Sequence, residues 1–409
     1  MEAGEYFRVI PAIAIETGGS GIRSWRALMG DNMKSNTYDK INSIEIGRIN
    51  RNNIYNLIYK QGIVSKQSIA NTLNVSEPTV AQNLKQLIKE GLAAEVGFFP
   101  SKGGRKSVAY AIEHNARYAI GLDITVNHLS VVIVNVKSEI LARQKMRLRF
   151  KDDKKYFARV NSIMEGIITD AGIDRSKILG VGIALPAHIS ENLKRVTYAP
   201  ILQFTDGCTD AFAEFMNYPC VFINDASAAC LAENWMEEDV ENVVYLSLSN
   251  SVGGAILINN EIYNGENYRS AEFGHVVIHP DGKKCYCGKR GCADAYCNAK
   301  VLSNHTEGNL ERFFKEAKTS EKNRKVLDSY LTNLCRISDM LRMSFDCKVI
   351  LGGYVGSYLD EYLPEIRERL AQLNSFELDG SYLRTCHFKK EASAVGAALH
   401  YIAGFLEGI

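Results

Sequence analysis

The sequence contains no run of about 18 apolar residues, the minimum length for a membrane-spanning helix. Residues 1–20 also lack a basic start followed by an apolar stretch and a cleavage site, so no secretory signal is indicated. There are no internal repeats, and the formal net charge of +1 means that any affinity for nucleic acid must come from a local feature. We therefore expect a cytoplasmic protein with no membrane association. Its 409 residues suffice for two or three domains.

Disulfide bonds are not indicated either, although the chain has ten cysteines. Most are scattered through apolar contexts, which fits a reducing compartment. Three of them, Cys285, Cys287 and Cys292, lie within eight residues and alternate with glycines that permit tight turns. The alternative interpretation is three unrelated buried thiols, because free cysteine is common in protein cores.

A closed tetrahedral zinc site needs a fourth ligand, and His275 and His279 are the local candidates. Four protein ligands leave no open position, so we expect a structural Zn²⁺ ion. The same stretch carries two acids, Glu272 and Asp294. A metal that fixes this segment would hold both carboxylates in place, as recognition of several hydroxyls on a sugar or polyol requires.

Residues 1–40 show no sustained periodicity, and we expect them to be disordered. Residues 41–115 predict a winged helix-turn-helix, with a first helix over 44–59 whose inward face includes Ile46 and Ile49. Ser76 is the predicted N-cap of the third helix, which ends near Gly91. The outward residues of that helix, which we expect to contact DNA, are Ser76, Thr79, Gln82, Asn83 and Gln86.

The segment after the third helix predicts a two-stranded wing with Lys102, Arg105 and Lys106 at its tip. Residues 41–112 contain nine Lys or Arg against four Asp or Glu, a net charge of about +5. This local excess is typical of a module that binds phosphates. A helical protein-interaction module with a solvated basic face is the alternative.

From Tyr118 the pattern becomes α/β, with apolar strands alternating with helices. A single helix is predicted over 301–318, and an apolar helix over 394–406. Asn224 and Asp225 follow a buried strand, at the carboxyl end where ligands bind in open α/β sheets. Capping of the next helix is the alternative role for Asp225.

The spacing Glu-x-Gly-His followed by Cys-x-Cys-Gly-x-x-Gly-Cys resembles the ROK family of repressors, open reading frames and sugar kinases. The wing sequence Gly-Gly-Arg-Lys resembles that of ROK repressors. The resemblance implies an α/β fold with an N-terminal winged helix-turn-helix and a two-lobed actin-like ATPase (ribonuclease H-like) domain. It also implies that His275, Cys285, Cys287 and Cys292 bind zinc and that Asn224, Asp225, Glu272, His275 and Asp294 bind a sugar between the lobes. The family has Glu where Asp294 stands.

By the same resemblance, 116–239 with the helix 394–409 form the first lobe and 240–393 form the second lobe with the zinc site. Family kinases use an aspartate that matches Asp225 as general base. Their phosphate-binding loops, however, carry glycine and threonine at positions that are Thr125, Asn127, Asn250 and Ser251 here. We therefore expect no enzyme activity, with Asp225 a vestigial base.

The sequence thus predicts a transcriptional regulator, expected to be a repressor of carbohydrate uptake or metabolism, whose affinity for operator DNA changes when a sugar or sugar phosphate binds. A homodimer or homotetramer is expected. Two alternatives stay open: an active ATP-dependent sugar kinase, and a regulator controlled by a protein partner.

Overall fold

The computed structural model describes residues 43–100, 106–190, 192–204, 207, 209–237 and 240–409. The predicted N-terminal extension over 1–40 lies outside these residues. The chain divides into unit 1 (Met1–Ile223, Trp235–Asp239 and Ala397–Ile409) and unit 2 (Asn224–Asn234 and Val240–Gly396). Across the described ranges, no helix combines the length and apolar character needed to cross a membrane.

Three helices and a small sheet begin unit 1, as a winged helix-turn-helix requires. The helices are α2 (Ser43–Gln61), α3 (Lys66–Leu73) and α4 (Glu77–Lys89), and the strands β1 (Val64–Ser65), β2 (Ala93–Phe98) and β3 (Val108–Ile112) pair in the order β1-β3-β2. Ser76 caps α4 as predicted, since its Oγ accepts a hydrogen bond from the Thr79 N–H at 3.4 Å. Asn74 takes the left-handed conformation that turns the chain between α3 and α4.

The prediction for the start of α2 was wrong. Ile46 and Ile49 are 49% and 43% exposed, whereas Ile54 and Ile58 further along the helix are fully buried. Among the α2 residues whose burial is described, the buried ones begin at Ile54, so the core of this module starts at that point of the helix.

The helix α14 (Ala392–Glu407) ends against α2. The side-chain amides of Asn52 and Asn56 donate to the carbonyl oxygens of Glu407 and Leu406 at 3.1 and 3.2 Å. These bonds satisfy carbonyl groups that have no partner at the end of a helix. The end of α14 is therefore attached to the first helix of the DNA-binding module.

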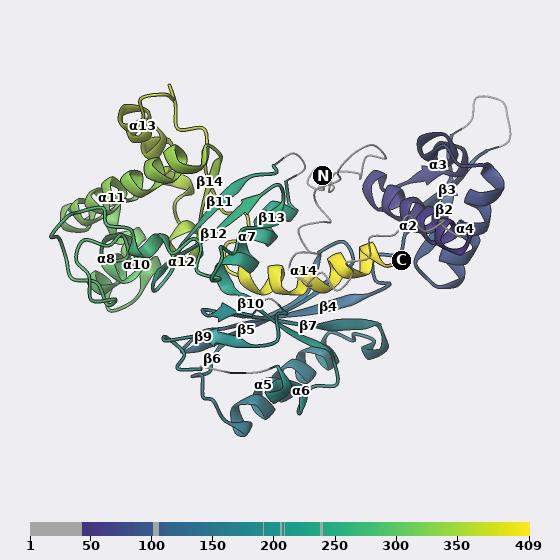
Figure 1. Ribbon diagram of the computed structural model, residues 1–409, viewed down its shortest axis with the longest axis horizontal. Coiled ribbons are helices and arrows are strands. Elements are labelled where there is room, and N and C mark those ends of the chain that lie inside the picture. Colours follow the sequence, from purple (N-terminus) through teal and green to yellow (C-terminus); the bar gives the residue numbers. More distant parts are fainter. Residues whose placement is uncertain (1–42, 101–105, 191, 205–206, 208, 238–239) are drawn as a thin grey trace. The chain divides into compact units, whose positions relative to one another are not determined.

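The second part of unit 1 is a five-stranded sheet in the order β10-β7-β4-β5-β6. Its strands are β4 (Tyr118–Ile124), β5 (His128–Asn135), β6 (Ile140–Arg147), β7 (Ile178–Leu185) and β10 (Cys220–Asn224). The sheet lies between α14 and α5 (Lys154–Asp170) (Figure 1). On the α14 side, a Cβ at Gly182 would lie 2.0 Å from the Ala397 carbonyl oxygen, so glycine is required for this close approach. Short elements complete the unit: η1 (Arg175–Lys177), β8 (His188–Ile189), β9 (Val196–Tyr198) and α6 (Asp210–Ala213).

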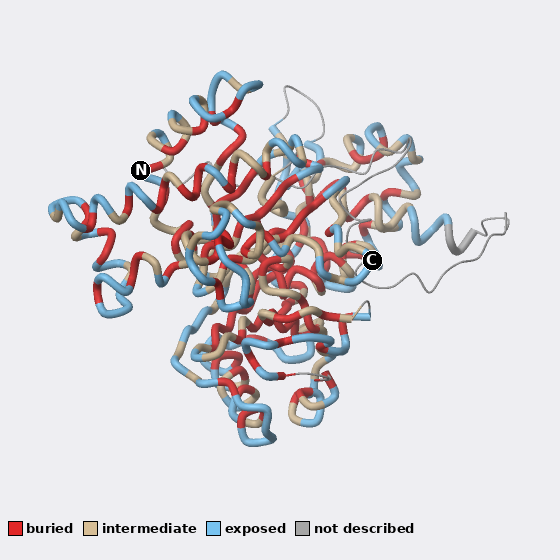
Figure 2. Tube along the Cα trace, turned by 60° about the vertical axis from the view of Figure 1, so that its left-hand side comes forward, coloured by how far each residue is buried: buried red, intermediate tan, exposed pale blue. Residues whose placement is uncertain are grey.

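Unit 2 contains a second five-stranded sheet in the order β13-β12-β11-β14-β15. Its strands are β11 (Val243–Leu248), β12 (Val252–Ile258), β13 (Glu261–Ile262), β14 (Lys348–Gly352) and β15 (Leu383–Thr385). In both sheets the first three strands in the sequence form an antiparallel meander, β4-β5-β6 in one and β11-β12-β13 in the other. The next strand, β7 or β14, then pairs parallel to β4 or β11. The two units thus repeat one topology, although the sequence has no detectable repeat. Both sheets are buried along most of their length (Figure 2).

The helices of unit 2 lie before, between and after the strands of the second sheet in the sequence. They are α7 (Asp225–Trp235), η2 (Phe273–His275), α8 (Asp294–Cys297), α9 (Lys300–Ser303), η3 (Asn304–Thr306), α10 (Leu310–Ala317), α11 (Glu321–Phe345), α12 (Gly353–Gly356), η4 (Asp360–Tyr362) and α13 (Leu363–Leu373). The single helix predicted over 301–318 was wrong. Gly308 has a positive φ of 85°, and Asn309 starts a new helix by accepting the Arg312 N–H at 2.9 Å.

The units differ from the predicted domains in two respects: the predicted DNA-binding domain groups with the first lobe in unit 1, and one helix changes sides. Most of α7, which was expected in the first lobe, groups with unit 2. The buried carboxylate of Glu233 explains this, because it accepts hydrogen bonds from Arg384 at 3.0 Å and from the N–H groups of His387 and Phe388 at 2.8 Å.

Candidate functional site

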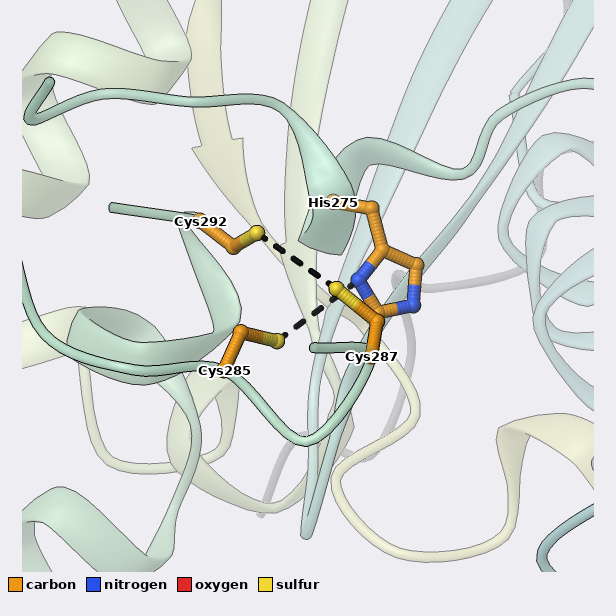
Figure 3. A group of neighbouring side chains, drawn as sticks. All are labelled: His275, Cys285, Cys287 and Cys292. Carbon is orange, nitrogen blue, oxygen red and sulfur yellow. Dashed lines mark hydrogen bonds between the residues drawn. The ribbon is translucent and has the colours of Figure 1, made fainter. Parts of the chain in front are cut away.

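Four side chains of unit 2 converge on one point and could hold a metal ion. His275, Cys285, Cys287 and Cys292 each offer a ligand atom, and these atoms all lie within 4.8 Å of one another (Figure 3). Cys287 Sγ lies 3.7 Å from Cys292 Sγ, and Cys285 Sγ lies 3.8 Å from His275 Nδ1. Three sulfurs and an imidazole nitrogen form the donor set of a closed tetrahedral site.

The backbone around the cysteines adopts the tight turns that the glycines predicted. Gly288 and Gly291 have positive φ values of 93° and 82°, and a Cβ at Gly291 would lie 1.7 Å from the His279 carbonyl oxygen. The Cys285 N–H donates to the Lys289 carbonyl at 2.8 Å, which closes the loop between the first and last thiol. No other residue type fits at Gly291 without moving this loop.

The two histidine candidates have separate roles in the structure. His279 lies away from the thiols, with its Nε2 2.6 Å from the Asn333 side-chain oxygen. His275 directs Nδ1 toward Cys285, while its Nε2 lies 3.1 Å from the Tyr286 hydroxyl and 4.0 Å from Glu272. Sequence reasoning missed Tyr286, whose position between two cysteines was the available signal.

Asn224 and Asp225 are positioned by the start of α7. The side-chain oxygen of Asn224 accepts the Ser227 N–H at 3.0 Å, so Asn224 and not Asp225 provides the helix cap. One Asp225 carboxylate oxygen accepts the Ala226 N–H at 2.9 Å. The carboxylate of Asp225 is thereby oriented without being used as the cap.

The charge state of Asp225 depends on burial and on a neighbouring acid. Loss of hydration, together with the negative charge of Glu272, raises the pKa of Asp225 to about 6. Glu272 in turn lies 4.0 Å from His275, with its side chain half exposed. The predicted residues Asn224, Asp225, Glu272 and His275 therefore all belong to unit 2, and the last three form a continuous series of neighbours.

Asp294, the last residue that the resemblance implies for sugar binding, lies at the start of α8. Its carboxylate is buried, with 3% of the residue exposed. One oxygen accepts the Val252 N–H at 2.7 Å and the other accepts the Asn298 amide at 3.3 Å. The side chain is one methylene shorter than the glutamate of the family pattern, and it connects the metal loop to the β11–β12 hairpin.

In each of the two loops that resemble phosphate-binding loops, backbone N–H groups donate hydrogen bonds to other atoms of the protein. At the β4–β5 turn, the Thr125 hydroxyl accepts the His128 N–H at 3.1 Å and the Thr125 N–H donates to the His128 carbonyl at 3.0 Å. At the β11–β12 hairpin, Asp294 takes the Val252 N–H. Backbone N–H groups of Thr125 and His128 at the first turn, and of Val252 at the second, are thus already bonded within the protein.

Gly352 ends β14 and Gly353 begins α12. A Cβ at Gly352 would lie 2.0 Å from the Tyr245 hydroxyl oxygen, and the Gly353 N–H donates to that same oxygen at 3.2 Å. These glycines have a packing role in the turn whether or not a nucleotide binds.

In the DNA-binding module, the predicted recognition residues differ in how far they are exposed. Gln82 and Gln86 are exposed, whereas Thr79 and Asn83 are half-buried. The Asn83 side-chain amide donates to the Thr79 carbonyl at 2.8 Å, and Gln86 donates to Glu90 at 3.1 Å. Gln82 is therefore the amide side chain of α4 best placed for a base edge.

Basic residues flank this helix. Lys106, which precedes β3, is exposed, while Lys102 and Arg105 of the predicted wing tip lie outside the described residues. Lys85 is also exposed on α4, three residues after Gln82, and the prediction overlooked it. Its helical spacing from Gln82 was the signal that could have identified it.

The comparison with protein families agrees with this arrangement. Residues 119–403 match the model of the ROK family. The chain belongs to the ROK family. Residues 52–97 match the model described as the iron dependent repressor, N-terminal DNA binding domain. The predicted fold class is confirmed: an N-terminal DNA-binding domain of the helix-turn-helix type precedes a ROK domain of actin-like fold.

Relatives of this ROK protein include the xylose repressor of Bacillus spizizenii, which is 28% identical over 260 residues, 63% of this chain and 67% of that protein. The chain spans about two thirds of the length of the curated relatives it matches, between 65% and 67% for three of them. One similar solved structure is the crystal structure of a ROK family transcriptional regulator, a homologue of the Escherichia coli Mlc protein. It has a TM-score of 0.68 at 20% identity, and the match covers 88% of this chain and 98% of the other chain. A ROK family glucokinase from Streptomyces griseus in complex with glucose and AMPPNP has a TM-score of 0.58 at 22% identity, over 69% and 98% of the two chains.

Proposed function

We propose that the protein is a sugar-responsive transcriptional repressor of carbohydrate uptake or metabolism. The observation that carries the proposal is a helix-turn-helix DNA-binding domain joined to a ROK domain in which Asp225, Glu272 and His275 are neighbours. The names of its relatives, which include a xylose repressor, support the same function. The ligand is a sugar or sugar phosphate, and its binding changes the affinity for operator DNA.

Asn224, Asp225, Glu272 and His275 provide the hydrogen-bonding groups of the sugar site. Carboxylates accept hydrogen bonds from hydroxyl groups, and the amide of Asn224 can both donate and accept. The cap bond to Ser227 fixes the Asn224 side chain, so this residue loses little conformational entropy when a ligand binds. A sugar can shift the protein between two states only if it binds one of them more tightly.

The hydrogen bonds that the N–H groups of Thr125 and Val252 make within the protein support a regulator over a kinase. Phosphoryl transfer needs backbone donors that hold the nucleotide phosphates. At the β11–β12 hairpin, one such donor, the Val252 N–H, is already bonded to Asp294. ATP binding with the affinity of an ordinary kinase is therefore disfavoured.

The ion proposed for the His275 cluster is Zn²⁺ in a structural role. A Zn–S bond of about 2.3 Å in tetrahedral geometry separates two sulfurs by roughly 3.8 Å. The 3.7 Å between Cys287 and Cys292 fits this value. His275, Cys285, Cys287 and Cys292 would hold the zinc ion. The bound ion would thereby cross-link the segment that carries Glu272.

A repressor that reads a palindromic operator acts as a symmetric oligomer, so a homodimer or homotetramer is part of the proposal. Gln82 and Lys85 of α4 would enter the major groove, and Lys106 would contact the phosphate backbone. The exposure of these three side chains supports their role.

The decisive experiment measures the full-length protein with a panel of sugars and sugar phosphates, with and without ATP. Thermal shift should detect at least one stabilising sugar in the absence of ATP, and gel shift should detect a change in operator affinity with the same sugar. The Asp225→Ala variant should lose both responses and keep its DNA affinity without sugar. If no sugar or sugar phosphate binds, control by a protein partner becomes the better explanation.

An ATP-dependent sugar kinase is the second candidate. Asp225, with a pKa of about 6, would suit a general base, and the fold resembles that of a glucokinase. Coupled detection of ADP separates the two functions. Turnover of about 1 per second or faster, dependent on sugar, would establish the kinase and refute the regulator-only proposal.

A further inference from the structure

A cavity of about 410 Å³ lies in unit 2 apart from the residues assigned to the sugar and metal sites. It is formed by α9 with η3, by one face of α11, and by the segment that enters the metal loop. We call it the α11 pocket, and the side chains that matter here are Lys283, Lys300, Lys325, His305, Tyr296 and Asn333. Its volume is in the range of sites that bind small molecules.

The charge of the α11 pocket has one sign. Lys283, Lys300 and Lys325 come from three separate segments, and none of the eleven lining residues is Asp or Glu. Glu321 pairs with Lys325 at 2.7 Å, but both side chains are more than three quarters exposed, so this pair is weak and easily exchanged. Cations that surround a concave surface concentrate their field inside it.

The walls of the α11 pocket are fixed before any ligand binds. The Tyr330 hydroxyl donates to the Cys297 carbonyl at 2.6 Å, and the Asn333 amide donates to the Ser329 carbonyl at 2.8 Å. The backbone N–H of Lys283 donates to the Tyr296 hydroxyl at 2.7 Å. Lys283 is thus held between Tyr296 and the metal loop that begins at Cys285, and a ligand would not have to order this segment.

We propose that the α11 pocket binds a phosphorylated small molecule, at a site separate from Asp225 and Glu272. A phosphate group carries a charge between about −1.5 and −2 at neutral pH, and the three ammonium groups offer the donors to match it. The apolar side chains of Val301 and Val326 line the remainder of the cavity and suit the organic part of such a ligand. The limited volume of about 410 Å³ favours a small molecule over an acidic protein segment, which would need an extended surface.

Isothermal titration of the full-length protein with glucose 6-phosphate and with inorganic pyrophosphate tests this proposal, at constant ionic strength and with glucose as the uncharged control. We expect saturable binding of at least one phosphorylated probe at one site per chain. Lys300→Ala and Lys325→Ala should each weaken it about tenfold. Lys315→Ala, which removes an exposed lysine of α10 outside the pocket, should leave it unchanged.

Asp225→Ala separates the α11 pocket from the sugar site. Binding of the phosphorylated probe that survives in Asp225→Ala but is lost in Lys300→Ala supports the proposal, whatever happens to the response to neutral sugars. Loss in Asp225→Ala with no effect of the lysine variants would overturn it, because the probe would then occupy the sugar site. Equal weakening by Lys315→Ala, or no saturable binding of either probe, would also overturn it.

Discussion

In the proposed sugar site, the raised pKa of Asp225 predicts a sugar affinity that depends on pH. A carboxylate accepts hydrogen bonds from sugar hydroxyls, and its protonated form loses part of that capacity. With a pKa of about 6, Asp225 is almost fully ionised at pH 7.5 and only about one quarter ionised at pH 5.5. If the ionised form alone binds, apparent affinity should fall about fourfold as the pH decreases through this interval.

The assay is calorimetric titration of the zinc-loaded protein with its sugar between pH 5.5 and 8, with metal content checked at each pH because zinc binding also releases protons. Asp225→Asn should bind more weakly and show no slope in this range. Glu272→Gln removes the charge that helps to raise the pKa of Asp225, so its profile should shift to lower pH. An Asp225→Asn profile as steep as that of the unmodified protein would refute the assignment of Asp225 as the acceptor.

Two further predictions concern the metal and the DNA. Cys292→Ser should abolish zinc binding, measured by elemental analysis, and lower the melting temperature, because a structural metal contributes directly to folding. Cys347→Ser, outside the cluster, should retain zinc. Native protein that contains no zinc would contradict this prediction. Lys106→Ala should weaken binding to every duplex and reduce the salt slope by up to about 0.9, while Gln82→Ala should mainly change sequence preference in a competition gel shift. Unchanged DNA binding in both variants would favour a protein-interaction module.

The metal cluster could be predicted because its ligands are close in sequence and its glycines have a direct conformational meaning. Three cysteines within eight residues have few ways to be arranged, and Gly291 is forced by its contact with the His279 carbonyl. The α4 cap at Ser76 was predictable for the same reason, since a cap is decided within one turn. The break at Gly308 was equally local and could have been predicted from the Gly-Asn pair.

Features that depend on distant parts of the chain could not be predicted. The partner of Asp294 is Val252, 42 residues earlier, and no local pattern reveals that bond. The three lysines of the α11 pocket come from separate segments that only the fold brings together. The repeated sheet topology of the two units is carried by strand order and not by residue identity, so sequence comparison within the chain does not detect it.

The length of the side chain at position 294 connects these observations. The carboxylate of Asp294 reaches the Val252 N–H at 2.7 Å from a buried position, and an added methylene of about 1.5 Å would push a glutamate past that donor. Aspartate at this position therefore fixes the start of β12 through the Val252 N–H. The resemblance gives the family a longer carboxylate here, so the length of the side chain, and not its charge, is what differs. We propose that this bond disfavours phosphoryl transfer together with the residues at Thr125 and Ser251, and that glycine at those two positions alone would not restore it.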